Sequence, residues 1–264
     1  MTEILLSIFF ISVLLLFLST GVWVALSMIG VSTIAMTLFT SRPVGDAMAT
    51  TIWGTSSSWT LTALPLFVWM GEILFRTKLS ENLFEGLSPW MQKLPGGLIH
   101  VNVVGCALFA AISGSSAATV ATVGKMSIPE LRKRNYPEKI LLGSLAGSGT
   151  LGLLIPPSII LIIYGVTVQE SIAKLFVAGI IPGIMIALIF MSYVILWSLF
   201  NKKQMPNIVN QYSFIDKIKR SGQLIPVIIL IFSVIGSIYT GIATATEAAS
   251  LGVVGALILS HFQK

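Results

Sequence analysis

Two stretches of the chain place small polar residues in the middle of long apolar segments. Residues 112–119 read ISGSSAAT, and residues 146–158 read AGSGTLGLLIPPS. Glycine and serine weaken a helix and an interior proline removes a backbone hydrogen bond, so both stretches should interrupt helices. Unwound carbonyl groups and hydroxyls can bind a small cation, while the N-terminal ends of half-helices can face an anion. The residue types therefore predict a site for an alkali cation beside a carboxylate.

The alternative is that these small residues only let helices pack closely. Each stretch alone favours that alternative, but the two together, each in a segment whose length also argues for a break, favour a binding site. Two carboxylates, Glu72 and Glu247, lie closest to membrane depth, and an interfacial role is favoured for both. The sequence contains no motif of a catalytic triad, a Walker site or a histidine metal centre, so no enzyme activity is expected.

The elements that must position these residues are membrane helices. Of 264 residues, 55% are hydrophobic and 10% are charged, with a net charge of +6. A membrane-crossing helix needs roughly 20 apolar residues, so five to seven crossings fit into the uncharged runs 4–41, 47–71, 94–124, 140–169, 175–201, 221–246 and 248–263. This composition excludes a cytosolic enzyme, a nucleic-acid-binding domain and, with Cys106 as its single cysteine, a disulfide scaffold. The predicted fold is an all-α polytopic bundle that includes the first run as a retained span.

The basic residues indicate the topology. They cluster at 125–139 and 202–220, which the positive-inside rule assigns to the cytoplasm. The run 94–124 is broken by its polar centre, so it predicts a re-entrant hairpin with arms over 98–112 and 117–128. Residues 77–97 have the apolar spacing of an amphipathic helix lying in the membrane interface.

Three local breaks are also predicted. The first apolar run should divide at Ser19-Thr20-Gly21, Pro65 should kink its helix, and Pro157 should occupy the first turn of a half-helix. The segment 20–31 is echoed by 240–253, as expected if a second, inverted repeat opens near the C-terminal end.

Several motifs in order resemble the large membrane subunit (DctM-like) of tripartite ATP-independent periplasmic (TRAP) transporters. They are GGLIHVNV at 96–103, the serine-rich stretch at 112–119, LIPPS at 154–158, YGV at 164–166 and TATEAA at 244–249. The resemblance implies a multi-pass permease in the bacterial inner membrane, of the elevator type, that imports an organic acid with a sodium gradient. Such acids include C4-dicarboxylates, sialic acid and sugar acids. Its partners would be a small (DctQ-like) membrane subunit and a periplasmic solute-binding protein, with sodium as the coupling ion and no other cofactor.

The resemblance also implies a division of the chain. It gives scaffold-type helices at 1–76, the interfacial helix at 77–97, a transport-type region at 98–170 with its hairpin (98–128) and broken helix (140–168), a helix and cytoplasmic basic loop at 171–221, and the start of a second, incomplete repeat at 222–264. The alternative function is a truncated, transport-inactive fragment that serves at most as a membrane scaffold or assembly partner.

The hairpin tip and the broken helix would then share one sodium site and part of a substrate cradle. The candidate sodium-binding residues are Ser113, Gly114, Ser115, Ser116, Thr119, Gly149, Thr150, Gly152 and Pro156. The candidate substrate-binding residues are Ser115, Ser116, Pro157 and Ser158.

Overall fold

A computed structural model describes residues 2–206 and 212–262, and all regular structure in these residues is helical. Part of the predicted basic loop, 207–211, and the last two residues lie outside the described part. The chain divides into two compact units, Met1–Ser57 and Ser58–Lys264. The prediction of an all-α fold is confirmed.

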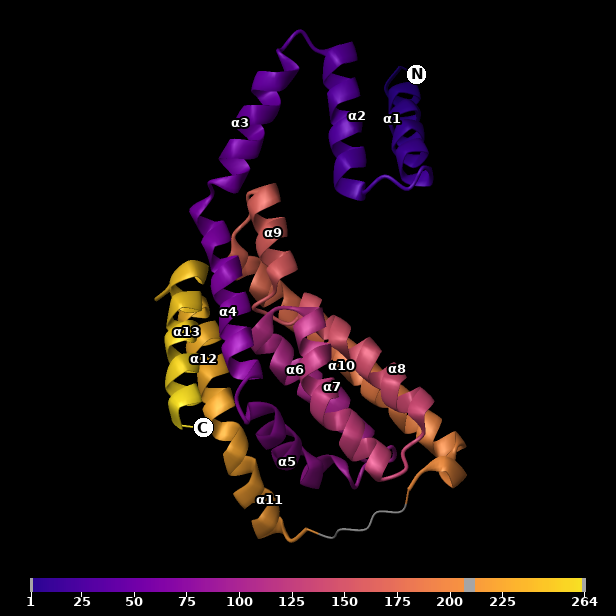
Figure 1. Ribbon diagram of the computed structural model, residues 1–264, viewed down its shortest axis with the longest axis vertical. Helices are drawn as coiled ribbons and strands as arrows, with labels where there is room; N and C mark the ends of the chain where they lie inside the picture. The colour runs from indigo at the N-terminus through magenta and orange to yellow at the C-terminus, as the bar shows by residue number, and fades with distance from the viewer. Residues whose placement is uncertain (1, 207–211, 263–264) are drawn as a thin grey trace. The chain divides into compact units, whose positions relative to one another are not determined.

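The first unit contains three helices, α1 (Thr2–Ser19), α2 (Val24–Phe39) and α3 (Val44–Ser56). The predicted break at residues 19–21 is present, and Gly21 adopts a positive φ of 79° there. Helices α1 and α2 lie side by side (Figure 1). Most of their large apolar side chains are exposed, as expected for helices surrounded by lipid or by other membrane segments.

In the second unit, α4 (Ala63–Phe75) packs along α13 (Ala245–Phe262), which also contacts α12 (Ile225–Tyr239) (Figure 1). A short 3-10 helix, η1 (Trp59–Thr62), precedes α4. The prediction of a kink at Pro65 is wrong, because the chain breaks earlier, between α3 and η1. Pro65 lies in the first turn of α4, where its missing N–H costs no hydrogen bond.

The predicted interfacial helix is α5 (Leu79–Met91), which ends before the Pro95-Gly96-Gly97 turn. It packs against α11 (Phe214–Ser221) and the following 3-10 helix η4 (Gly222–Leu224). The Trp90 indole N–H donates to the Ser221 hydroxyl at 2.8 Å, which joins the two amphipathic helices.

The remaining helices form the bundle that holds the candidate residues (Figure 1). They are α6 (Ile99–Ser113), α7 (Ser116–Lys133), α8 (Glu138–Gly149), η2 (Thr150–Leu153), α9 (Ile159–Val168), α10 (Ile172–Phe200) and η3 (Lys202–Gln204). Helices α6, α7 and α8 contact one another, and α10 packs on α6, α8 and α9. The hairpin and the interrupted helix are therefore present, although the second hairpin arm runs five residues beyond its predicted end.

Within the described residues, three helical segments are long and apolar enough to cross a membrane, namely Ile172–Phe200, Phe214–Tyr239 and Ala245–Phe262. The pair Val44–Ser56 and Trp59–Phe75 adds a fourth if the two helices form one span. Shorter apolar helices include the first hairpin arm and α9. The described part of the chain has the features of a membrane protein, with fewer uninterrupted spans than its uncharged runs allow.

Candidate functional site

The hairpin turns at two residues, Gly114 and Ser115. Gly114 ends α6 in the left-handed conformation, with φ 60°, and its amide donates to the Ala110 carbonyl. Ser115 is extended, and its hydroxyl accepts a hydrogen bond from the amide of Ala118 in the first turn of α7. A C-terminal glycine followed by an N-capping serine is a common way to end one helix and begin another. The local sequence therefore accounts for the tight tip.

Buried hydroxyl groups connect the two arms across this tip. The Ser113 Oγ lies 3.0 Å from the Thr119 Oγ1, and both residues are buried. The Thr119 hydroxyl also donates to the Ser115 carbonyl at 2.8 Å. Three candidate residues thus form one hydrogen-bonded group inside the tip.

The second break separates α8 from α9. Helix α8 ends at Gly149, η2 adds one tight turn, and α9 begins after Ser158. The prediction that Pro157 occupies the first turn of α9 is wrong, because Pro157 precedes the N-cap Ser158. The Pro156–Pro157 bond is cis. The chain between η2 and α9 is irregular and presents backbone groups to its neighbours.

The tip and this break meet backbone to backbone. The Ile159 amide donates to the Gly114 carbonyl at 3.2 Å. A Cβ atom on Gly114 would lie 2.7 Å from the Pro157 carbonyl oxygen, and one on Gly152 would lie 3.0 Å from the Ser116 amide nitrogen. Only glycine leaves room for such contacts. We call this region, residues 113–119 with 149–159, the tip–break junction.

One oxygen in the tip–break junction has no hydrogen-bond partner. The Ser116 Oγ is buried, and among the described residues nothing donates to it or accepts from it. Such buried polar atoms are uncommon, because an unpaired hydroxyl costs about 1–3 kcal/mol. Ser116 lies directly beside Gly152. Among the side chains of the junction, the Ser116 hydroxyl is therefore the group that would gain most free energy from contact with a bound ligand.

A small hollow borders the other side of the tip. Its volume is about 130 Å³, and it is lined by Val68, Gly71, Glu72, Phe75, Ser113, Ser115, Ala118 and Ala121. The closest approach is at Gly71, where a Cβ atom would lie 3.0 Å from the Ser113 Cα. The Glu72 carboxylate forms an exposed ion pair with Arg76 at 2.8 Å. Helix α4 thus contributes one carboxylate near the otherwise uncharged tip.

A buried polar contact sets the position of α8 against α6. The Asn102 amide donates to the Leu141 carbonyl at 3.3 Å and to the Ser144 hydroxyl at 3.0 Å, and Asn102 is fully buried. The Ser148 hydroxyl, farther along α8, lies 3.4 Å from the Asn102 carbonyl. Because α6 leads to the tip and α8 leads to the break, these bonds align the two.

A family model described as "Tripartite ATP-independent periplasmic transporter, DctM component" matches residues 11–264. The chain belongs to the DctM family. The DctM family is a family of transporters, not of enzymes.

Individual relatives agree with this assignment. The chain is 33% identical over 216 residues to the C4-dicarboxylate TRAP transporter large permease protein DctM of Pseudomonas aeruginosa, a match that covers 82% of the chain and 50% of the relative. It is 34% identical over 252 residues to the isethionate TRAP transporter permease protein DctMQ of Oleidesulfovibrio alaskensis, with 94% and 38% covered. It is 33% identical over 244 residues to the sialic acid TRAP transporter large permease protein SiaM of Vibrio cholerae, with 92% and 56% covered. The chain spans about half the length of these curated relatives.

In this DctM-family chain, most candidate residues meet at the tip–break junction. The exceptions are side chains that form hydrogen bonds within their own segment or are buried in it. Thr150 is exposed and its hydroxyl donates to the Gly147 carbonyl, and the Ser158 hydroxyl donates to the Leu153 carbonyl at 2.8 Å. Pro156 is buried within the break. The backbone of the DctM break, more than its side chains, faces the tip.

Sequence reasoning did not find Gly71 or Asn102 in this DctM chain. Gly71 is one glycine within an apolar helix, and its contact with Ser113 depends on tertiary packing. Asn102 is a single polar residue in a long apolar run, which is a detectable signal for a buried interhelical hydrogen bond. The sequence places Glu72 near membrane depth, but its position beside the tip could not be predicted from the sequence.

Proposed function

We propose that this chain forms part of the membrane permease of a TRAP transporter that imports an organic acid across the bacterial inner membrane with a sodium gradient. A periplasmic binding protein delivers the substrate, and a small membrane subunit completes the membrane complex. The observation that carries the proposal is the tip–break junction, where a hairpin turn and an interrupted helix meet through their backbones beside the unpartnered Ser116 hydroxyl. Irregular backbone at membrane depth is tolerated where it lines a site.

The chemistry of the junction supports a monovalent cation. The candidate residues are uncharged, and their oxygens belong to hydroxyls and backbone carbonyls. Sodium is bound by such hard oxygen ligands, whereas coupling to protons requires a group that titrates. The unpartnered Ser116 hydroxyl, beside Gly152, would gain a ligand from a bound cation.

The helix ends at the junction support an anionic substrate. Helix α7 begins at Ser116 and α9 begins at Ile159, and the bond from Ile159 to Gly114 brings these two N-terminal ends together. Helix N-termini carry partial positive charge, which favours a carboxylate. Each sodium ion moving inward gains about 2.3 kcal/mol per 100 mV of membrane potential, which can drive accumulation of an anion.

Sodium-dependent uptake with a Ser116→Ala variant tests the proposal. The chain is reconstituted in vesicles as part of a complete transporter with its binding protein and small subunit, and uptake of C4-dicarboxylates and sialic acid is measured against sodium. Ser116→Ala should raise the sodium concentration for half-maximal uptake at least tenfold, because it removes one ligand. Thr122→Val is the matched control, because the buried Thr122 hydroxyl donates within α7, to the Ala118 carbonyl at 2.7 Å.

Two outcomes would contradict the proposal. Normal uptake by the Ser116→Ala variant at low sodium concentration would show that the junction is not the site where sodium is coupled to uptake. Absence of uptake by the unsubstituted chain, with all partners present and membrane insertion intact, would favour the scaffold alternative.

A further inference from the structure

A second cavity lies where α5, α7 and α11 come together, and Phe75 of α4 lines both this cavity and the hollow beside the tip. Its volume is about 490 Å³, and it is lined by Phe75, Thr77, Glu81, Phe84, Glu85, Ser88, Lys125, Met126, Pro129, Glu130, Arg134, Tyr212 and Arg220. It is roughly the size of a small-molecule site. We call it the headgroup cavity.

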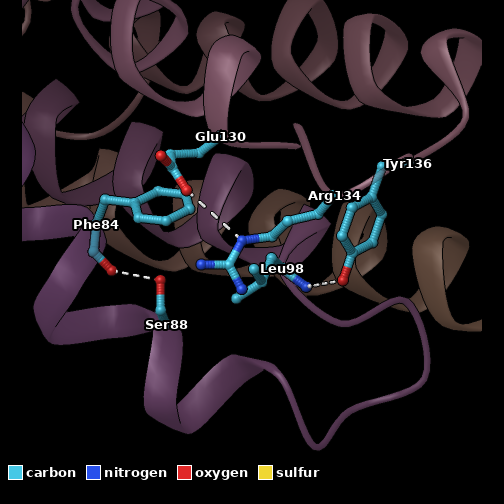
Figure 2. A network of polar contacts seen from close by, with 6 residues as sticks. All are labelled: Phe84, Ser88, Leu98, Glu130, Arg134 and Tyr136. Carbon is cyan, nitrogen blue, oxygen red and sulfur yellow. Dashed lines mark hydrogen bonds and ion pairs between the residues drawn. The ribbon is translucent and has the colours of Figure 1, made fainter. Parts of the chain in front are cut away.

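The charged side chains of this cavity cancel, with three cations and three carboxylates. Some of them already have partners. Arg134 and Glu130 form an ion pair at 3.5 Å, which Figure 2 shows beside Phe84 and Ser88 of α5. The Glu85 carboxylate accepts a hydrogen bond from the Gln223 amide at 3.3 Å.

Among the described residues, two cations and the carboxylates of Glu81 and Glu85 remain without a partner of opposite charge, although Glu85 accepts the hydrogen bond from Gln223. The Lys125 ammonium lies 5.2 Å from the Phe75 ring centre, and the Arg220 guanidinium lies 4.9 Å from that of Tyr212. Within the described residues, neither cation and no atom of Glu81 takes part in an ion pair. Both signs of charge are therefore available to a ligand.

The sequence context indicates the depth of this cavity in the bilayer. Lys125 and Arg134 belong to the first basic cluster and Arg220 belongs to the second, and both clusters are predicted to be cytoplasmic. Helices α5 and α11 are amphipathic, and Phe214 and Ile215 of α11 are 66% and 75% exposed. Amphipathic helices with such faces lie at the boundary between headgroups and acyl chains. The cavity is then at the level of the lipid headgroups.

We propose that the headgroup cavity binds the aminophosphate headgroup of a zwitterionic phospholipid from the cytoplasmic leaflet. Lys125 and Arg220 bind the phosphate, and Glu81 binds the primary ammonium group. Basic pockets between membrane helices are known sites for the phosphate groups of anionic lipids. A purely anionic headgroup would leave Glu81 unpaired, whereas a zwitterion matches a lining whose charges cancel. Phe84, Met126 and Pro129 offer apolar surface to the carbon atoms of the ligand.

Lipid retention measured by native mass spectrometry tests this assignment. The full chain is stripped of lipid and reloaded with phosphatidylethanolamine, phosphatidylglycerol or phosphatidylcholine of identical acyl chains. We expect at least fivefold higher retention of phosphatidylethanolamine, because it alone pairs a phosphate with an ammonium group that has N–H donors. The double variant Lys125→Ala/Arg220→Ala should lower this retention to the phosphatidylcholine level.

Matched controls lie on the same helices. Lys133→Ala and Lys219→Ala remove exposed cations of α7 and α11 that do not line the cavity, and they should leave retention unchanged. The conservative pair Lys125→Arg/Arg220→Lys should restore it, and the helical circular dichroism spectrum checks that each variant is folded. Equal retention of the three lipids, or an equal loss in the control variants, would overturn the proposal.

A soluble competitor separates a lipid from a free phosphate ester. Glycerophosphoethanolamine has the same headgroup chemistry without acyl chains. If this compound fails to displace bound phosphatidylethanolamine, the ligand is the lipid. Displacement at micromolar concentration would overturn the assignment of the ligand as a lipid. Because the readout is lipid retention, it is independent of sodium-coupled uptake at the tip–break junction.

Discussion

The two ends of the helical hairpin are held in place by different kinds of contact. At the tip, Gly114 and Ser116 meet the break through backbone atoms, and no charged residue belongs to the junction. At the base, a side chain makes the contact, because the Tyr136 hydroxyl accepts from the Leu98 amide at 3.1 Å, while Arg134 pairs with Glu130 within the end of α7 (Figure 2). Backbone contacts fix positions that side-chain rotation cannot adjust. The tip should therefore be the less tolerant end.

The largest effect is expected from Gly114→Ala. The substitution forces alanine into a left-handed backbone conformation and places its Cβ atom 2.7 Å from the Pro157 carbonyl oxygen. It should therefore lower the free energy of unfolding by about 3 kcal/mol. Unfolding in mixed detergents measures it. Gly143→Ala in α8 is the control, because nothing lies within 4 Å of its Cβ position. It should stabilise by up to about 1 kcal/mol, and equal losses in both variants would contradict the role of close approach.

Asn102→Ala should have an intermediate effect, because Asn102 is fully buried in the first turn of α6 and bonds to α8. It removes the side-chain bonds to Leu141 and Ser144 and should cost about 1–2 kcal/mol of unfolding free energy. Asn201→Ala provides the comparison. Among the described residues, the Asn201 side-chain amide bonds to the Trp197 carbonyl alone, at the end of α10, so about 0.5 kcal/mol is expected there. A smaller loss for Asn102 than for Asn201 would show that the buried bonds do not align α6 with α8.

The smallest effect, about 1 kcal/mol, is expected from Tyr136→Phe at the base, because one hydrogen bond to Leu98 is lost. Burial raises the pKa of Tyr136 above its usual 10.0. The hydroxyl therefore stabilises the fold at pH below 10, and this contribution is lost as the pH rises through the raised pKa. The difference in unfolding free energy between wild type and Tyr136→Phe, measured from pH 8 to 11, should shrink above pH 10. Tyr193→Phe, at an exposed position, is the control and should change the unfolding free energy by less than about 0.5 kcal/mol. A difference between wild type and Tyr136→Phe that does not depend on pH would contradict the burial of the Tyr136 hydroxyl.

The positions of the breaks could be predicted from the sequence, because they depend on local chemistry. Glycine and serine at 113–116 and the glycines and prolines at 147–157 disfavour a continuous helix whatever surrounds them. Two proline assignments were wrong for the same reason. Pro65 is accommodated in the first turn of α4 and Pro157 precedes the N-cap residue of α9, and helix starts are harder to place than helix interruptions.

The tertiary partners of the tip could not be predicted. Gly71 approaches Ser113 only because α4 crosses the hairpin, and no pattern in α4 marks that glycine. The same holds for the headgroup cavity, which joins Lys125 to Arg220 across two separate basic clusters. The clusters themselves were visible in the sequence, while their convergence on α5 was not.

The hydrogen bond from the Ile159 amide to the Gly114 carbonyl has a mechanical consequence. It joins the start of α9 to the hairpin turn without any side chain, so no rotamer change can release it. A force that displaces the hairpin along the membrane normal is transmitted through this bond to α9. The two broken segments would then move together.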